Sequence, residues 1–288
     1  MITRREWIAS CGVAAASGKD QRIPVYAHIW LYAARLPDRN PAPEISSILR
    51  DLSGSGVDGV EVMNPVIFTD ESFRKLPELS KETRLPITGS SWNANTWKAE
   101  EHDRILKDGK LLIERLASLK ARNLGMSVGN AGRKKTEAEF DAQAAVLRKL
   151  IRMASDHGVL LNLHNHVYEV ADDEYDLSNT LKRVPEAKLG PDIGWLVRAG
   201  VDPLAFIRRH STRLVYFHIR NELPGGKWPE DLTEGIIDYA AIGRLLREIR
   251  FSGEVAIELA HDNGFTPKRS NGENFRISRK WLKEKAGL

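Results

Sequence analysis

One pattern repeats along the chain after residue 20: a short apolar run that ends in a polar residue, followed by a segment with helical spacing of apolar residues. Eight strand-like runs of this kind occur, over residues 23–30, 56–64, 85–91, 123–130, 158–166, 188–195, 214–221 and 253–260. Strand–helix alternation repeated eight times predicts an α/β fold, with parallel strands closed into a single (β/α)8, or TIM, barrel over residues 21–288. A doubly wound open sheet is the alternative, but no G-x-G-x-x-G motif follows the first run, which disfavours a dinucleotide-binding fold.

Composition and charge exclude several other classes of protein. The chain of 288 residues is 42% hydrophobic and 28% charged, which is ordinary for a folded soluble domain. No run of about 18 apolar residues occurs, so no membrane span is predicted. A net charge of +4, spread over 43 basic and 39 acidic residues, predicts no nucleic-acid partner. The single cysteine, Cys11, excludes a disulfide within one chain, and a homo-oligomer is left open.

The first 20 residues are set apart from the barrel. Arg4 and Arg5 precede a short apolar run, ASCGVAAASG, as in a twin-arginine export signal, and the alanines at 14–16 offer a small-residue cleavage site. The alternative is a disordered tail that carries two arginines by chance. We expect a periplasmic or otherwise exported protein if the signal works, and a cytoplasmic one if it does not.

Polar residues stand where the strand-like runs end, and the carboxyl ends of barrel strands form the active-site face. Among them, His164 and His166 lie two residues apart and therefore point to the same side of their strand. A lone histidine at a strand end is more often structural than functional. Four successive strands that end in His, Asp, His and Glu instead predict a site for one divalent metal ion such as Mn, Co, Zn or Fe. The polar or aromatic residues at these ends are His28, Glu61, Ser91, Trp92, His164, His166, Asp192, His218 and Glu258.

These positions resemble the xylose isomerase-like TIM-barrel superfamily of sugar isomerases and epimerases. The segments 191–221 and 235–260 look like the family's stretch from the sixth-strand Asp to the seventh-strand His and like its final helix and strand. The resemblance extends over residues 25–285 and is most specific in the second half. It implies that Asp192, His218 and Glu258 ligate a divalent metal, Mg included.

The sequence departs from the family pattern at several site positions. The family usually has Glu on strand five, where this chain has His164, as in a sub-branch with His-x-His followed by Glu. His166 and Glu169 are then left for substrate contact or proton transfer, and Glu258 is both a ligand and a candidate base.

Two further departures affect substrate binding. Trp195 replaces a histidine that helps to bind substrate in many relatives, and Arg220 with Asn221 replaces a common Lys-Asp pair. We expect the substrate to be contacted by His28, Glu61, Trp92, Trp195 and Arg220.

The function that these residues predict is a divalent-metal-dependent sugar isomerase or epimerase. It would remove a proton from the carbon next to a carbonyl and pass through an enediolate. A lyase or dehydratase that acts on a keto-sugar or keto-glycoside at the same site is the alternative. Two readings are disfavoured. A DNA-repair enzyme of the endonuclease IV type needs a histidine where Trp195 stands, and a non-catalytic sugar-binding barrel does not explain an intact ligand set.

Overall fold

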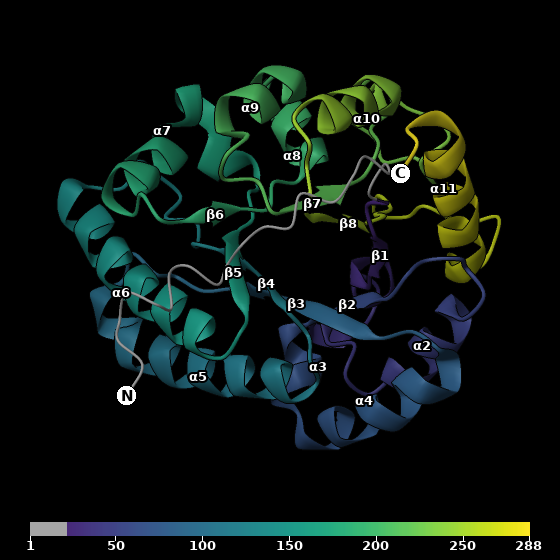
Figure 1. Ribbon diagram of the computed structural model, residues 1–288, viewed down its shortest axis with the longest axis horizontal. Coiled ribbons are helices and arrows are strands. Elements are labelled where there is room, and N and C mark those ends of the chain that lie inside the picture. Colours follow the sequence, from purple (N-terminus) through teal and green to yellow (C-terminus); the bar gives the residue numbers. More distant parts are fainter. Residues whose placement is uncertain (1–21) are drawn as a thin grey trace, which may run out of the picture.

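A computed structural model describes residues 22–288, and its centre is an eight-stranded sheet in which every paired strand is parallel (Figure 1). The predicted (β/α)8 barrel is confirmed, and each of the eight strand-like runs overlaps one strand; β3 continues two residues beyond its run. The export signal predicted for residues 1–20 lies outside the described residues. The strands are β1 (Val25–His28), β2 (Val60–Met63), β3 (Ile87–Asn93), β4 (Asn123–Ser127), β5 (Leu160–Leu163), β6 (Lys188–Leu189), β7 (Tyr216–Ile219) and β8 (Glu254–Ile257).

The barrel closes between its sixth and seventh strands. The hydrogen-bonded order is β6-β5-β4-β3-β2-β1-β8-β7, and two isolated parallel bridges, Leu189–Leu214 and Asp192–His218, join the two ends of this sheet. The second bridge pairs two residues that the sequence predicts to be metal ligands. The seam of the barrel therefore runs directly beneath the candidate site.

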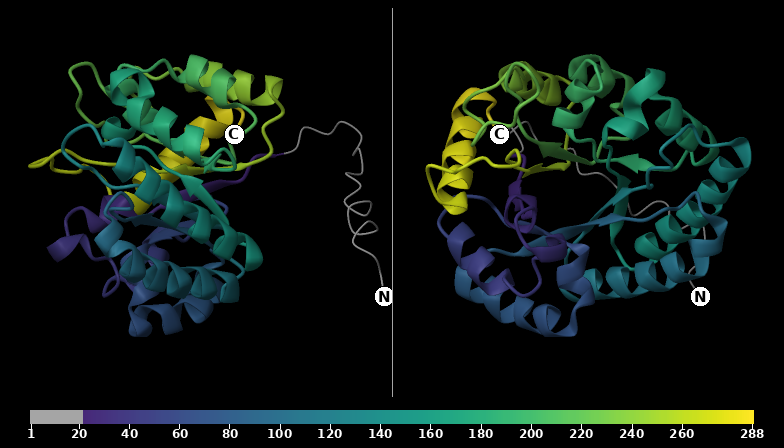
Figure 2. Two further views of the ribbon diagram at one scale, coloured as in Figure 1. Left: turned by 90° about the vertical axis from the view of Figure 1, so that its left-hand side faces the viewer. Right: turned by 180° about the vertical axis from the view of Figure 1, so that it is seen from behind.

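Helices form a ring outside the strands, which is seen from both ends of the barrel (Figures 1 and 2). Two of them, α5 and α6, lie on segments whose apolar residues repeat at helical spacing. None of the described helices has the length and apolar content needed to span a membrane. The helices are α1 (Trp30–Ala33), α2 (Ile45–Leu52), α3 (Asn64–Phe68), α4 (Asp70–Thr83), α5 (His102–Ser118), α6 (Glu137–Asp156), α7 (Val167–Arg183), α8 (Ile193–Arg198), α9 (Pro203–His210), α10 (Tyr239–Glu248) and α11 (Asn271–Lys285).

The strands read as apolar runs because both of their faces are buried. All four residues of β1 and of β7 are buried, one face against the barrel interior and the other against the helices. Along α5 the apolar residues repeat at helical spacing, and Ile105, Leu112 and Leu116 are fully buried against the sheet. Burying side chains of this size contributes about 1.5–3 kcal/mol each, which fixes the strand ends that carry the site.

Two helices begin at predicted site residues, and their first turns orient these side chains. Asp192 is the N-cap of α8, and one of its carboxylate oxygens accepts a hydrogen bond from the Trp195 backbone N–H at 3.1 Å. His166 is the N-cap of α7, and its backbone N–H donates to Glu169 at 2.7 Å. The sequence after β5 and β6 therefore sets both the fold and the geometry of the candidate site.

Candidate metal centre and pocket

A cavity of about 570 Å³ opens at the carboxyl ends of the strands. This volume is in the range of pockets that take small-molecule ligands. The predicted site residues that line the cavity are His28, Trp92, His164, His166, Trp195, Arg220 and Glu258. The remaining four, Glu61, Glu169, Asp192 and His218, lie beneath or behind its wall.

Glu61 lies below His218 in the barrel interior, not in the cavity where substrate contact was expected. Its side chain is 1% exposed and accepts hydrogen bonds from His218 Nε2 at 2.7 Å and from the Tyr216 hydroxyl at 2.8 Å. The prediction that Glu61 touches substrate is therefore wrong for this geometry. A carboxylate behind a histidine fixes the ring orientation and leaves the other ring nitrogen, Nδ1, directed at the mouth.

His218 and His164 meet at the seam of the barrel. Their Nδ1 atoms lie 2.7 Å apart, so one proton or one cation must separate the two nitrogen lone pairs. Burial lowers the pKa of His218, but the nearby Glu61 carboxylate more than offsets this and raises it to about 9. Burial, together with the His218 ring, holds the pKa of His164 well below its usual value. In the metal-free chain His218 is thus the charged partner and donates its Nδ1 proton to His164.

Asp192 and Glu258 share one arginine. The buried Arg220 guanidinium contacts Asp192 Oδ2 through Nε at 2.9 Å and through a terminal nitrogen at 2.6 Å, and it also pairs with Glu258 Oε1. Burial raises the pKa of Glu258, but Arg220 and the neighbouring histidines outweigh it and hold this pKa well below its usual range. Glu258 is therefore an ionised carboxylate that faces the cavity at neutral pH.

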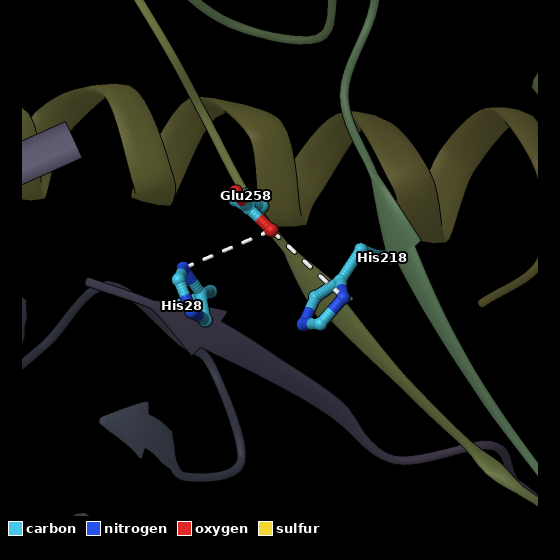
Figure 3. Close-up of side chains that lie close together, drawn as sticks. All are labelled: His28, His218 and Glu258. Atoms are coloured by element: carbon cyan, nitrogen blue, oxygen red, sulfur yellow. Dashed lines mark ion pairs between the residues drawn. The ribbon is translucent and has the colours of Figure 1, made fainter. Parts of the chain in front are cut away.

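The other oxygen of Glu258 faces two histidines. Its Oε2 lies 3.8 Å from His28 Nδ1 and 3.8 Å from His218 Nδ1 (Figure 3). His28 Nε2 lies 2.9 Å from the Ser91 hydroxyl. The Trp30 backbone N–H points at His28 Nδ1 from 3.2 Å, so that nitrogen carries a lone pair. His28, predicted to contact substrate, thus also lies among groups of the metal-ligating type.

Two overlapping sets of side chains bring such groups together: His28, His218 and Glu258, and His164, Asp192 and Glu258. Within each set the ligand atoms lie within 4.8 Å of one another. The four residues predicted as ligands converge from four strand ends, and Glu258 belongs to both sets. Imidazole nitrogens and carboxylate oxygens are the ligands that borderline divalent ions prefer.

The local charge also fits a divalent cation. Three buried carboxylates, those of Glu61, Asp192 and Glu258, face one guanidinium, that of Arg220. With His218 protonated, one negative charge is left over, and two are left over once His218 is neutral, as a metal ligand must be; uncompensated charge in a buried site is costly. One divalent ion would neutralise both and would replace the proton between His164 and His218. The donor set therefore fits the metal that the sequence predicts.

His166 lies beside this centre, and Ser127 holds its ring in place on the side away from the cavity. Its Nδ1 lies 3.2 Å from the Ser127 hydroxyl, which donates to the Glu169 carboxylate. When Glu169 is ionised, the Ser127 proton is used in this bond. The Ser127 oxygen then accepts the Nδ1–H of His166, and Nε2 of His166 carries no proton. Burial lowers the pKa of His166 to about 4, so the ring is neutral at pH 7.

Glu169 does not reach the cavity, although the sequence placed it in substrate contact or proton transfer. Its side chain is 4% exposed and is engaged by the His166 backbone N–H and by Ser127. Burial raises the pKa of its carboxyl to about 7. Glu169 acts on His166 through Ser127, a residue at the end of β4 that the sequence reading did not single out.

Aromatic side chains form one wall of the cavity. Trp195 lies edge-to-face against Trp228, with ring centroids 5.3 Å apart, and the guanidinium carbon of Arg220 lies 5.2 Å from each ring centroid. Trp228 comes from the long loop after β7, and periodicity could not have identified it.

Trp92 lines the cavity as expected, but little of its side chain is exposed there. It is 5% exposed, and a Cβ on Gly109 of α5 would come within 3.3 Å of two of its ring atoms. Its ring therefore fills the layer between β3 and α5. Ser91, its neighbour, points into the barrel instead and meets His28.

Comparison with known proteins agrees with this architecture. A family model described as xylose isomerase-like TIM barrel matches residues 49–285. An inosose dehydratase from Clostridium beijerinckii is 25% identical over 172 residues, which is 53% of this chain and 56% of that protein. The chain thus spans about half the length of the curated relatives it matches.

Solved structures resemble nearly the whole chain at low sequence identity. A sugar phosphate isomerase/epimerase from Parabacteroides distasonis superposes with a TM-score of 0.70 at 17% identity, covering 96% of this chain and 97% of that one. A 3-keto-D-glucoside 4-epimerase from E. coli gives 0.66 at 17% identity, covering 91% and 100%. The probable 3-DHS dehydratase from Bacillus anthracis gives 0.69 at 15% identity, covering 91% and 99%. At these identities the likeness is one of fold.

Proposed function

Because the chain belongs to the xylose isomerase-like TIM barrel family, we propose that it is a divalent-metal-dependent sugar isomerase or epimerase. Its reaction would begin with removal of a proton from the carbon next to a ketone or aldehyde. The observation that carries the proposal is the meeting of His164, Asp192, His218 and Glu258 at one mouth, with their ligand atoms close together.

These four residues would hold the metal, with Glu61 orienting His218 from below. When bound, such an ion supplies Lewis acidity, which withdraws electron density from a carbonyl oxygen and acidifies the neighbouring C–H bond. Its identity among Mn, Co, Zn, Fe and Mg is not fixed by the ligand types.

Proton transfer falls to two groups at the mouth, which follow two strands that are not neighbours. His166 follows β5 and offers a neutral ring with Nε2 unprotonated, and Glu258 follows β8 as a carboxylate. His166 takes the proton from the substrate carbon, because Ser127 holds its Nδ1–H away from the cavity. Return of this proton from His166 to a neighbouring carbon would shift the carbonyl. Inversion would need a proton on the other face: Glu258 would first take one from water and then give it to the carbon, while His166 releases its own proton to water.

The remaining wall residues orient the sugar and stabilise charge. Trp195 and Trp228 give an apolar surface on which the face of a sugar ring packs. Arg220, held between Asp192 and Glu258, places a fixed positive charge beside the oxygen on which negative charge develops.

A lyase or dehydratase is the second candidate, and the sequence matches to inosose dehydratases favour it specifically. The first step is the same. If a hydroxyl or glycosidic oxygen lies on the next carbon, the electron pair of the broken C–H bond forms a double bond and expels this oxygen. His166 then delivers to the leaving oxygen the proton that it has taken from carbon.

Metal content and product analysis test the proposal. We expect about one equivalent of divalent metal per chain in the purified protein. Asp192→Asn should lose it, and Asp202→Asn, which alters an exposed N-cap on α9, should keep it. Incubation with keto-sugars, followed by NMR of the products, separates the branches: a shifted carbonyl, an inverted centre or an unsaturated sugar. Absence of bound metal under all loading conditions would contradict the proposal.

A further inference from the structure

The cavity extends well beyond the candidate metal centre. Its outer part is formed by the segment after β1, with Trp30, Arg35 and Arg39, and by the segment after β8, with Asp262 and Phe265. We call this part the outer lobe. The whole cavity, about 570 Å³, is in the range that takes drug-sized ligands and is larger than one sugar ring requires.

The two parts are directly connected through the backbone. Trp30 lies two residues after His28, and its N–H points at His28 Nδ1 from 3.2 Å. A ligand seated over Glu258 and His28 therefore reaches the Trp30 side chain without leaving the cavity. Trp30 is only partly buried and offers ring surface to such a ligand.

The outer lobe carries an excess of positive charge. Arg35 donates to the Phe265 carbonyl at 2.7 Å, and the guanidinium of Arg39 lies 5.5 Å from the Trp30 ring centroid. Within residues 22–288, neither arginine forms an ion pair with a carboxylate. The one carboxylate in the lobe, Asp262, accepts the Trp228 backbone N–H at 3.2 Å.

This arrangement contrasts with the inner end of the cavity. There, Arg220 is matched by Asp192 and Glu258. Two guanidinium groups without such partners, beside an aromatic ring, suit a planar carboxylate on a ring-shaped ligand.

We propose that the outer lobe is a subsite for a second sugar ring that bears a carboxylate. The substrate class would then be an acidic glycoside, with its keto ring at the metal centre and its uronate ring against Trp30, Arg35 and Arg39. This inference rests on the proposed function for the placement of the keto ring, but the binding of the second ring does not require turnover.

Binding of unreactive probes tests the subsite. The probes are cellobiouronic acid, cellobiose and glucose, each titrated into the full chain by calorimetry at low salt. We expect the acid to bind at least about tenfold more tightly than cellobiose, because it gains charge-assisted hydrogen bonds, and glucose to bind weakest. The double variant Arg35→Gln, Arg39→Gln should bind the acid no better than cellobiose, and Trp30→Ala should weaken both disaccharides.

Arg50→Gln is the matched control, since Arg50 is an exposed arginine that pairs with Glu82 away from the cavity. It should leave all three affinities unchanged. Equal affinity for the three probes, or an advantage of the acid that survives in the double variant, would overturn the subsite. Proton exchange on a keto-monosaccharide together with equal probe affinities would keep the proposed function and reject the subsite. Preference for the acid without proton exchange would keep the subsite and reject the proposed function.

Discussion

Replacing Glu169 by Gln should make the protein more stable at alkaline pH and less active at the same time. Glu169 is almost fully buried, and burial raises the pKa of its carboxyl from 4.5 to about 7. In the unfolded chain the group ionises near its ordinary pKa. Between about pH 4.5 and 7 the folded chain therefore binds more protons than the unfolded chain, and stability falls as pH rises through this window.

The size of this loss of stability follows from the shift in the pKa of Glu169. Each pKa unit corresponds to about 1.4 kcal/mol, so the full cost of the ionised carboxylate is about 3 kcal/mol above pH 7. Glutamine has nearly the same shape and does not ionise, so the variant does not lose stability by burying a charge at this position. The stability advantage of Glu169→Gln over the parent should grow by about 2–3 kcal/mol between pH 5 and pH 8.

The same change should disturb His166. Both carboxylate oxygens of Glu169 accept hydrogen bonds, one from the His166 backbone N–H and one from Ser127. A glutamine amide can accept only one of them, and its NH2 group then turns the Ser127 proton towards His166 Nδ1. That reverses the tautomer of His166 and should lower turnover at least about tenfold.

Urea unfolding of both proteins at pH 5 and pH 8, with chelator present, measures the stability difference. Chelator removes the separate pH dependence of metal binding. Glu186→Gln, which alters an exposed carboxylate, serves as the control and should show no such trend. Parallel pH profiles for the parent and Glu169→Gln would refute the reasoning.

Four further variants test the ligand set, the residue behind His218 and the N-terminal segment. His164→Ala should lose bound metal, whereas His166→Ala should keep metal and lose turnover; metal analysis beside activity distinguishes them, and retention of metal in both would remove His164 from the ligand set. Glu61→Gln should weaken metal affinity about 10- to 100-fold, measured by competition with a chelator, because His218 loses the carboxylate that orients it; unchanged affinity would count against that role. Export by the first 16 residues remains a prediction: a chain shortened by them should fold and keep its activity, and intact Met1 in the cytosolic fraction of native cells would contradict export.

Much of the fold could be read from the sequence because buried parallel strands are apolar on both faces. The eight runs stand out for this reason, and the barrel then brings their ends together. His164, Asp192, His218 and Glu258 could be grouped without a structure, since each stands at a strand end on the same face of the barrel.

The depth and facing of individual side chains were harder to predict. Glu61 lies below the mouth, where the pairing of β2 with β3 shifts register beside it, and sequence does not reveal such a shift. Glu169 lies behind the cavity because α7 begins directly after His166. Trp92, by contrast, could have been placed: strand alternation turns it outward once Ser91 points inward.

Solvent exchange tests the central claim most directly. The metal-loaded protein, incubated in D₂O with a panel of ketoses, aldoses and keto-glycosides, should introduce deuterium at the carbon next to the carbonyl of at least one of them, as detected by NMR. Glu258→Gln should abolish this uptake, since it removes a ligand and a proton-transfer group together. Metal-loaded protein that exchanges no proton with any compound of the panel would contradict the account and leave a barrel that binds sugars without transforming them.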